Sequence, residues 1–208
     1  MIEQIAFEAR KSEYIDQKSG VSARLTISAY ENLYSVVQRR MLMNKETTGV
    51  AHISDLYGIV PSITGKVELV YEGELEGISN VAFTLIGKAI RAEFLKTFPD
   101  PEKMKKSKMK NPYLDVISWF SEGNEVDLLT LTTQKDYEQS LKKVNGLLDV
   151  VRSYIKTNDA KELSLMMEFV LHGLSEYSQI SKKKIETAVK FSDLVGSIFN
   201  MKNGDDEG

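Results

Sequence analysis

Residues 16–26 read Asp16-Gln-Lys-Ser-Gly-Val-Ser-Ala-Arg-Leu-Thr26, a turn followed by the start of a helix. Gly20 permits a tight turn because glycine has no Cβ, and Ser22 is placed to cap a helix that begins at Ala23. Arg24 then falls in the first turn, at the positive end of the helix dipole. A guanidinium beside free backbone N–H groups can bind an anion. Physics alone favours a solvated arginine, because first-turn dipole effects are only about 0.3–1 kcal/mol.

On both sides of this segment, apolar residues recur at helical spacing. The pattern predicts helices over residues 2–9, 25–41, 78–90, 114–120, 137–155, 163–174 and 185–198. Asp159 and Glu162 are spaced like a capping box, and Ser181 is placed as the N-cap of the last helix. The best strand-like segment, Val67-Glu-Leu-Val-Tyr71, is short. The predicted fold class is therefore all-α.

Proline and lysine mark the clearest break in the chain. Residues 98–112 contain three prolines and five lysines, a composition typical of an exposed linker. The polar end of the chain is typical of a frayed terminus. The predicted division is a helical domain over residues 1–75, a connecting helix and Pro/Lys-rich linker over 76–112, a helical extension over 113–202 and a disordered tail over 203–208.

Composition excludes several kinds of site. The 208 residues are 42% hydrophobic and 27% charged, as in an ordinary globular protein, and the net charge of -3 argues against nucleic-acid binding through bulk charge. There is no Cys, which removes thiolate metal sites and cysteine nucleophiles, and two histidines, His52 and His172, cannot form a three-histidine zinc site. No apolar run is long enough to span a bilayer, and the N-terminus carries no export signal. We therefore expect a cytoplasmic protein without membrane contact.

Other candidate motifs have simpler interpretations. Gly65-Lys66 is not a phosphate loop, because Val60 and Val67 occupy the positions that need Gly and Ser or Thr. His172 lies near an apolar stripe and is predicted to be an interior residue. Solvated surfaces are favoured over nucleic-acid or metal binding for two charge clusters, Lys103, Lys105, Lys106, Lys108 and Lys110, and Glu68, Glu72, Glu74 and Glu76. The sequence thus predicts no catalytic residue and no metal ligand.

The segment Ser19-Gly-Val-Ser-Ala-Arg-Leu25, preceded by a short helix with Glu8-Ala-Arg10, resembles the start of the AAA+ lid in MoxR-type ATPases. These ATPases are relatives of the magnesium chelatase ATPase subunit. In that family a Gly-x-Ser-x-Arg stretch opens a lid helix, and its arginine is the sensor-2 residue. Gly20, Ser22 and Arg24 match that pattern. The resemblance implies that Arg24 reaches the γ-phosphate of ATP held by a preceding nucleotide-binding core.

Residues 50–66, Val50-Ala-His-Ile-Ser-Asp-Leu-Tyr-Gly-Ile-Val-Pro-Ser-Ile-Thr-Gly-Lys66, resemble the short lid helix that follows in the same family. Ser54 would cap this helix, and Asp55 would lie in its first turn. The family commonly has a His-Arg pair where this chain has Gly65-Lys66, so no role of Lys66 is carried over. The resemblance covers about residues 1–70, and it implies an AAA+ helical lid followed by a helical-bundle extension.

The resemblance also implies the C-terminal part of a larger ATPase, with its nucleotide-binding core upstream of Met1. The parent protein would bind ATP and Mg²⁺, form a ring of neighbouring subunits, usually a hexamer, and work in remodelling or metal insertion as a chaperone. A protein with a von Willebrand factor A domain is an implied partner. The chain by itself is expected to be inactive, with no cofactor bound, because one arginine cannot hold Mg²⁺ and activate water.

Two alternatives remain open from the residues. The chain is also consistent with an autonomous all-α protein-interaction module without a nucleotide role, in which Trp119, Phe120, Met166 and Met167 form a partner groove. A free-standing enzyme has less to support it, because no paired-carboxylate motif accompanies the two isolated histidines. A phosphate loop encoded directly upstream of Met1 favours the lid, whereas a true start codon there favours the module.

Overall fold

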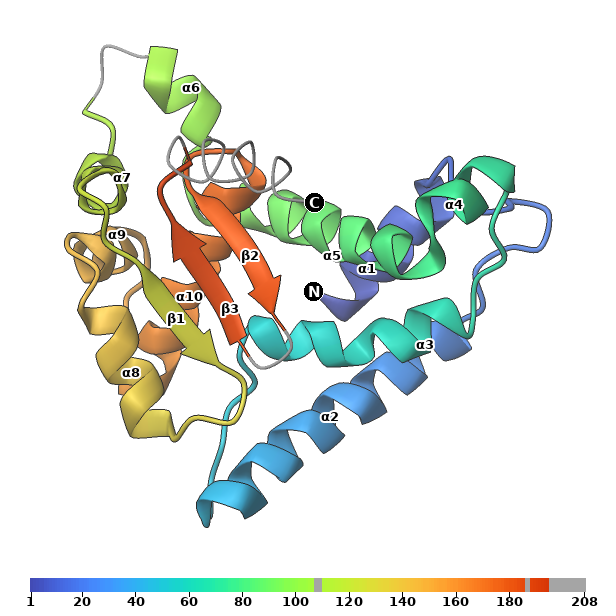
Figure 1. The fold of residues 1–208 in the computed structure, drawn as a ribbon, viewed down its shortest axis with the longest axis horizontal. Helices are drawn as coiled ribbons and strands as arrows, with labels where there is room; N and C mark the ends of the chain where they lie inside the picture. The colour runs from blue at the N-terminus through green and yellow to red at the C-terminus, as the bar shows by residue number, and fades with distance from the viewer. Residues whose placement is uncertain (107–109, 186–187, 195–208) are drawn as a thin grey trace, which may run out of the picture. The chain divides into compact units, whose positions relative to one another are not determined.

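The computed structural model describes residues 1–106, 110–185 and 188–194 (Figure 1). The chain forms two compact units, Met1–Lys96 and Thr97–Gly208. Residue 75, where the predicted lid ends, falls inside a helix of the first unit, and the predicted linker over 98–112 begins just after the unit boundary. None of the helices in the described ranges is both long enough and apolar enough to cross a bilayer.

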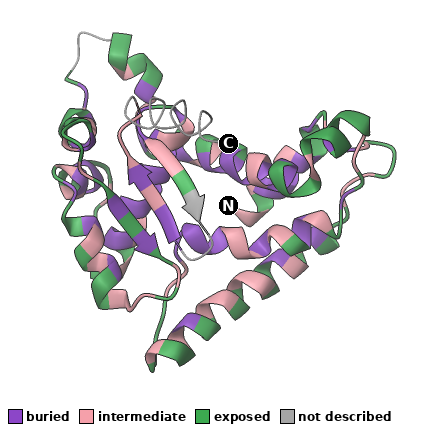
Figure 2. Cartoon of the chain, viewed as in Figure 1, coloured by how far each residue is buried: buried purple, intermediate pink, exposed green. Residues whose placement is uncertain are grey.

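The first unit is helical. Its elements are α1 (Ile2–Lys11), α2 (Arg24–Asn44), the 3₁₀ helix η1 (Ser54–Ile59), α3 (Val60–Thr64), α4 (Tyr71–Glu76) and α5 (Ile78–Phe94). Helix α5 lies at the centre and packs against α1, α3 and α4. Its predicted apolar stripe is buried at Val81, Ala82, Leu85, Ile86, Ala89 and Ile90, and Figure 2 shows buried stretches alternating with exposed ones along the helix. The helices predicted over 2–9, 25–41 and 78–90 are confirmed.

Helix α2 is more exposed than its length suggests. The buried residues of this helix are Leu25, Ala29 and Arg40, and most of its surface is exposed or half-buried (Figure 2). Ile27, Tyr30 and Tyr34 are 61%, 65% and 56% exposed. Because these residues are spaced by three and four, they share one side of the helix. An apolar face of α2 is therefore left uncovered.

Val67–Tyr71, the most strand-like segment of the sequence, does not form part of a sheet among the described residues. Instead, Leu69 forms an isolated antiparallel bridge with Ile15, and α4 begins at Tyr71. The amide of Asp16 donates to the Glu68 carbonyl at 2.9 Å, and the amide of Val70 donates to the Tyr14 carbonyl at 3.1 Å. These bonds tie the chain between α1 and α2 to the chain between α3 and α4.

The second unit contains a sheet, so the all-α prediction is wrong there. Its elements are α6 (Pro101–Lys106), α7 (Leu114–Ser121), β1 (Val126–Leu129), α8 (Gln134–Lys142), α9 (Leu147–Tyr154), α10 (Ala160–Glu176), β2 (Ser181–Ile185) and β3 (Ala188–Ser192). The strands form an antiparallel sheet in the order β1-β3-β2. The chain is therefore helix-rich with a small sheet.

The helix predicted over 185–198 is wrong over 188–192, where β3 lies, and Ser181, its predicted N-cap, is the first residue of β2. Residues 186–187 and 195–198 of that prediction lie outside the described ranges, as does the tail 203–208. Val126 pairs with Phe191 and Leu128 with Val189, and all four side chains are buried. A period of two places them on one face of the sheet. The residues of β3 fit both a helical period and a strand period, and pairing with β1 on one side and β2 on the other makes this segment a strand.

The helix predicted over 137–155 is two helices. Helix α8 ends at Lys142, and α9 begins at Leu147 after Gly146, whose φ is +74°. Gly146 is the N-cap of α9, and such an angle favours glycine and cannot occur inside a continuous α-helix. Two other predictions in this unit are confirmed: α7 stops before Gly123, and the Asp159 carboxylate caps α10 by accepting from the amides of Lys161 at 2.7 Å and Glu162 at 3.2 Å.

The turn between α8 and α9 gives a test of this break. A Cβ added at Gly146 would lie 2.6 Å from the Asp115 Cβ, whereas one added at Gly123, which also has a positive φ, would meet open space. Both substitutions place an alanine at a positive φ, which is destabilising, but Gly146→Ala also forces a steric clash. We expect it to lower the free energy of unfolding by about 1–3 kcal/mol more than Gly123→Ala, as measured by urea denaturation. Equal losses would contradict the close contact.

Candidate functional site: a cationic pocket at the start of α2

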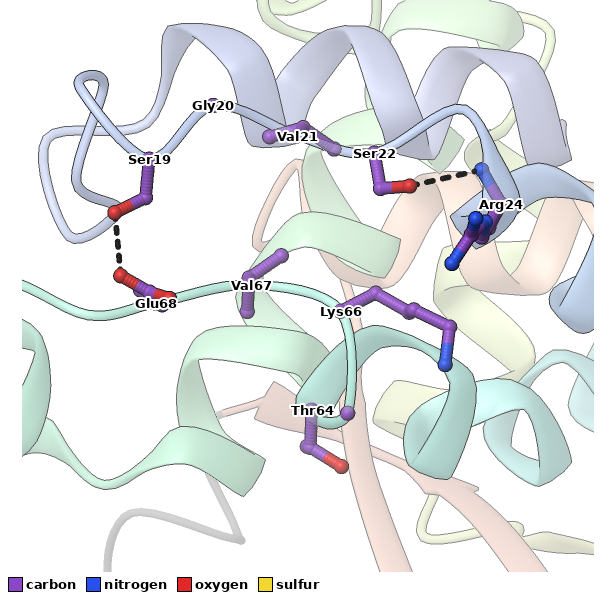
Figure 3. Close-up of a pocket in the computed structure, with 10 residues that line it drawn as sticks. Ser19, Gly20, Val21, Ser22, Arg24, Thr64, Lys66, Val67 and Glu68 are labelled. Carbon is purple, nitrogen blue, oxygen red and sulfur yellow. Dashed lines mark hydrogen bonds between the residues drawn. The ribbon is translucent and has the colours of Figure 1, made fainter.

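Arg24 lines an open pocket of about 660 Å³ within the first unit (Figure 3). One wall is formed by residues 19–22 and Arg24, and the other by residues 64–68. The pocket brings together Gly20, Ser22 and Arg24, the three site residues predicted from the sequence. It adds Lys66, for which no role is predicted from the sequence.

The backbone before α2 fixes the position of Arg24. Gly20 adopts a φ of +68°, and its amide donates to the Asp16 carbonyl at 3.2 Å. Helix α2 begins at Arg24, one residue later than predicted, and its N-cap is Ala23 rather than the predicted Ser22. The Ser22 Oγ accepts from the Arg24 amide at 3.2 Å, and the Ser22 carbonyl accepts from the Leu25 amide at 3.0 Å. The turn at Gly20 and the hydrogen bonds of Ser22 therefore fix the backbone position from which the Arg24 side chain extends.

Polar contacts of Asp16 and Ser19 connect this loop to the opposite wall. The Asp16 carboxylate accepts from the Lys18 amide at 2.8 Å, a bond that lowers the pKa of Asp16. The Ser19 hydroxyl lies 3.1 Å from the Asp16 carboxylate and also contacts the Glu68 carboxylate. Together with the Ile15–Leu69 bridge, these contacts fix the position of one wall of the pocket relative to the other.

The charges of the pocket are separated along its length. Figure 3 shows the side chains of Arg24 and Lys66 near one end, and Glu68 beside Ser19 at the other. Both cationic side chains are exposed. Within the described ranges, neither the Arg24 guanidinium nor the Lys66 ammonium forms an ion pair. One end of the pocket is therefore positive and able to bind an oxyanion.

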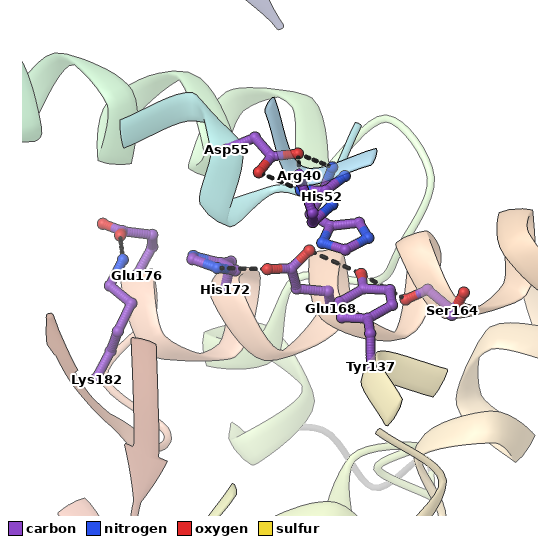
Figure 4. Close-up of polar contacts among 9 residues, drawn as sticks. All are labelled: Arg40, His52, Asp55, Tyr137, Ser164, Glu168, His172, Glu176 and Lys182. Carbon is purple, nitrogen blue, oxygen red and sulfur yellow. Dashed lines mark hydrogen bonds and ion pairs between the residues drawn. The ribbon is translucent and has the colours of Figure 1, made fainter. Parts of the chain in front are cut away.

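A buried ion pair positions the chain that leads to the second wall (Figure 4). The Arg40 Nη1 donates to the Asp55 carboxylate at 2.5 and 2.7 Å, and Nη2 donates to the Val50 carbonyl at 2.6 Å. Asp55 also accepts from the His52 amide at 2.7 Å. Arg40 and Asp55 are 2% and 3% exposed. The pair joins α2 to η1, which continues directly into α3 and Lys66.

Sequence reasoning missed this ion pair. Asp55 was correctly placed in the first turn of a short helix, here η1. Ser54 is the first residue of η1 rather than its cap. Arg40 lies inside the apolar stripe predicted over residues 25–41. A charged residue on an apolar face is a signal of a buried partner, because an unpaired buried charge is strongly unfavourable.

The second unit holds a separate buried polar cluster, centred on Glu168 and His172 of α10 (Figure 4). The Tyr137 hydroxyl donates to Glu168 Oε2 at 2.8 Å, and His172 Nε2 lies 3.6 Å from Glu168 Oε1. The His172 ring packs edge-on against Phe191 at 5.1 Å. His172 and Glu168 are both 0% exposed, which confirms His172 as an interior residue and keeps this cluster from binding a substrate directly.

The remaining candidates have no site geometry. Phe120 and Met167 are buried, and Trp119 and Met166 are half-buried, so only the latter two expose part of their side chains to solvent. The exposed residues of the two charge clusters are Lys103, Lys105, Lys106, Lys110, Glu68, Glu72, Glu74 and Glu76, while Lys108 lies outside the described ranges. Among the described residues, no group of three or more His, Asp or Glu side chains is placed to hold a metal ion.

Comparison with protein-family models, with curated proteins and with solved structures found no match to this chain. The pocket geometry and the residue pattern around Arg24 are therefore the basis for any functional conclusion. Both lie within the first unit.

The Arg40–Asp55 pair predicts a large stability effect. Asp55→Ala leaves a buried guanidinium without its counter-ion and the His52 amide without its acceptor. We expect the free energy of unfolding of the first unit to fall by about 3–5 kcal/mol, as measured by urea denaturation. Glu13→Ala, which removes an exposed carboxylate of the same unit, is the matched control. Similar small losses for the two variants would show that the pair does not hold α2 to η1.

His172 predicts a pH dependence. Burial lowers the pKa of His172, the nearby Lys182 ammonium adds to this, and Glu168 partly opposes it. The folded unit then keeps a neutral imidazole at a pH where an unfolded histidine, with a pKa of about 6.5, takes up a proton. Stability is therefore lost as pH falls below about 6.5, with a slope of up to about 1.4 kcal/mol per pH unit.

His172→Gln should remove this slope, because glutamine does not titrate. The measurement is the free energy of unfolding at a series of pH values from about 7.5 to about 5.5, a range that spans the unfolded histidine pKa. His52 is present in both proteins, so its contribution cancels in the difference. If the two curves ran parallel over this range, the burial of a neutral His172 would be refuted.

Proposed function

We propose that the first unit is the sensor-2 lid of a MoxR-type, magnesium-chelatase-like AAA+ ATPase, and that the chain is the C-terminal part of that protein. The observation that carries this proposal is the Arg24 side chain, which lines the pocket without an ion-pair partner in the described ranges. The pattern of Gly20, Ser22 and Arg24 supports it, because the glycine turn and the serine hydroxyl bonds position this arginine.

In this role Arg24 senses the nucleotide and does not cleave it. A guanidinium stays charged and donates hydrogen bonds in a planar fork that matches phosphate oxygens. ATP carries one phosphate more than ADP, so a contact with the γ-phosphate exists in only one nucleotide state. A ligand shifts a conformational equilibrium by its differential affinity for the two states. The position of the lid would therefore follow ATP hydrolysis.

In this proposal the parent protein would supply the chemistry of ATP hydrolysis. A nucleotide-binding core upstream of Met1 would hold ATP and Mg²⁺ and activate the attacking water. The core would sit in a ring of neighbouring subunits, a hexamer in the related ATPases. The ring would drive remodelling or metal insertion, with a von Willebrand factor A domain protein as its partner. The second unit would then be a family-specific extension that follows the lid.

The exposed apolar face of α2 favours a contact with another domain, here the proposed upstream core. Ile27 lies one turn after Arg24, and Tyr30 and Tyr34 continue along the same side of the helix. Contiguous exposed apolar side chains commonly mark an interaction surface. In the proposed arrangement the upstream core covers these residues when Arg24 contacts nucleotide.

The test is Arg24→Ala in the full-length ATPase. We expect ATP turnover or nucleotide affinity to fall by about tenfold or more, because one charge-assisted contact is worth about 1.5–3 kcal/mol. Arg39→Ala, which removes an exposed arginine from the same helix, is the matched control and should have no effect. The readouts are steady-state ATP hydrolysis and equilibrium nucleotide binding. Unchanged values for Arg24→Ala in both assays would reject the sensor role.

A further inference from the structure

We propose that Lys66 is a second phosphate ligand in the Arg24 pocket, so that the site binds a diphosphate or triphosphate group through two cations. This inference rests on the proposed function, because it takes Arg24 as a phosphate ligand. It goes further by giving Lys66 a role and by defining the chemistry of the ligand. It also predicts that the chain binds such an anion by itself.

The backbone around Lys66 directs its side chain into the pocket. The Lys66 amide donates to the Ile63 carbonyl at 3.0 Å, in a turn that ends α3. Val67 is 8% exposed and anchors the next position in the core. Lys66 and Glu68, the residues on either side of Val67, are both exposed, and both line the pocket. Lys66 is thus held by a turn on one side and a buried valine on the other.

The electrostatics of the pocket favour a polyanion over a single charge. Arg24 and Lys66 come from separate segments and approach the same end of the pocket (Figure 3). Two like charges in one pocket repel each other, and an anion between them reverses the sign of the interaction. The pocket carboxylate, Glu68, is engaged by the Ser19 hydroxyl at the far end. A ligand with two adjacent phosphates can contact both cations at once.

Ser22 adds a neutral donor beside the two cations. Its Oγ accepts a hydrogen bond from the Arg24 amide, which leaves the hydroxyl proton available for a ligand oxygen. The pocket volume of about 660 Å³ is ample for a diphosphate or a triphosphate. Its two walls are tied together by the Asp16–Glu68 and Val70–Tyr14 hydrogen bonds. The site is therefore assembled before any ligand arrives, which lowers the entropy lost on binding.

The experiment is a titration of the ¹⁵N-labelled full chain with inorganic pyrophosphate at constant ionic strength, followed by amide chemical shifts. We expect saturable shifts at residues 19–24 and 64–68. Lys66→Gln should weaken pyrophosphate binding by about tenfold, the loss expected for one charge-assisted contact. Lys88→Gln, which removes an exposed lysine of α5 outside the pocket, is the matched control and should leave the affinity unchanged. The same spectra establish that each variant is folded.

The other outcomes separate this inference from the proposed function. If Arg24→Gln weakened binding and Lys66→Gln did not, the role of Lys66 would be overturned, and Arg24 would stand as a phosphate ligand. If wild-type shifts were absent, or lay outside both walls of the pocket, the two-cation site would be overturned. If pyrophosphate bound through both residues but Arg24→Ala left the full-length ATPase unchanged, the site would stand and the sensor role would fall.

Discussion

The antiparallel contact between residues 14–16 and 68–70 is the constraint on which the candidate site depends. It joins two segments more than fifty positions apart in the sequence through two backbone hydrogen bonds and the Ile15–Leu69 bridge. Without it, the loop that carries Gly20 and the turn that carries Lys66 would be independent surface segments. With it, cations from both segments share one pocket, and the buried Arg40–Asp55 pair holds the chain leading to Lys66 against α2.

Much of the helical structure and one wall of the site follow from the sequence. The stripe over 78–90 is regular enough to identify a buried helix, and α5 is the core of the first unit. The wall around Arg24 can also be predicted from the sequence, because a glycine turn, a serine hydroxyl and the start of a helix are all local features. Local signals of this kind need no knowledge of the rest of the fold. The opposite wall depends on a long-range contact, so Lys66 had no evident role.

The two wrong predictions in the second unit, a helix at β3 and one continuous helix over 137–155, have the same physical origin. Ala188, Val189 and Leu194 fit a helical stripe as well as a strand, and pairing with β1 on one side and β2 on the other makes residues 188–192 a strand. The break at Gly146 was hidden because the apolar pattern continues in phase across it. Tertiary partners override local preference in short apolar segments. Buried charges such as Arg40 and Glu168 are likewise explained by partners that lie far along the chain or on another element.

The most direct test of the central claim, that the Arg24 pocket binds phosphate oxygens, is a crystal structure of the full chain grown with inorganic pyrophosphate. The account predicts an anion between the two walls, within hydrogen-bond distance of the Arg24 guanidinium and the Lys66 ammonium, with the backbone of residues 14–16 and 68–70 unchanged. An empty pocket in crystals that hold pyrophosphate elsewhere on the chain would contradict it.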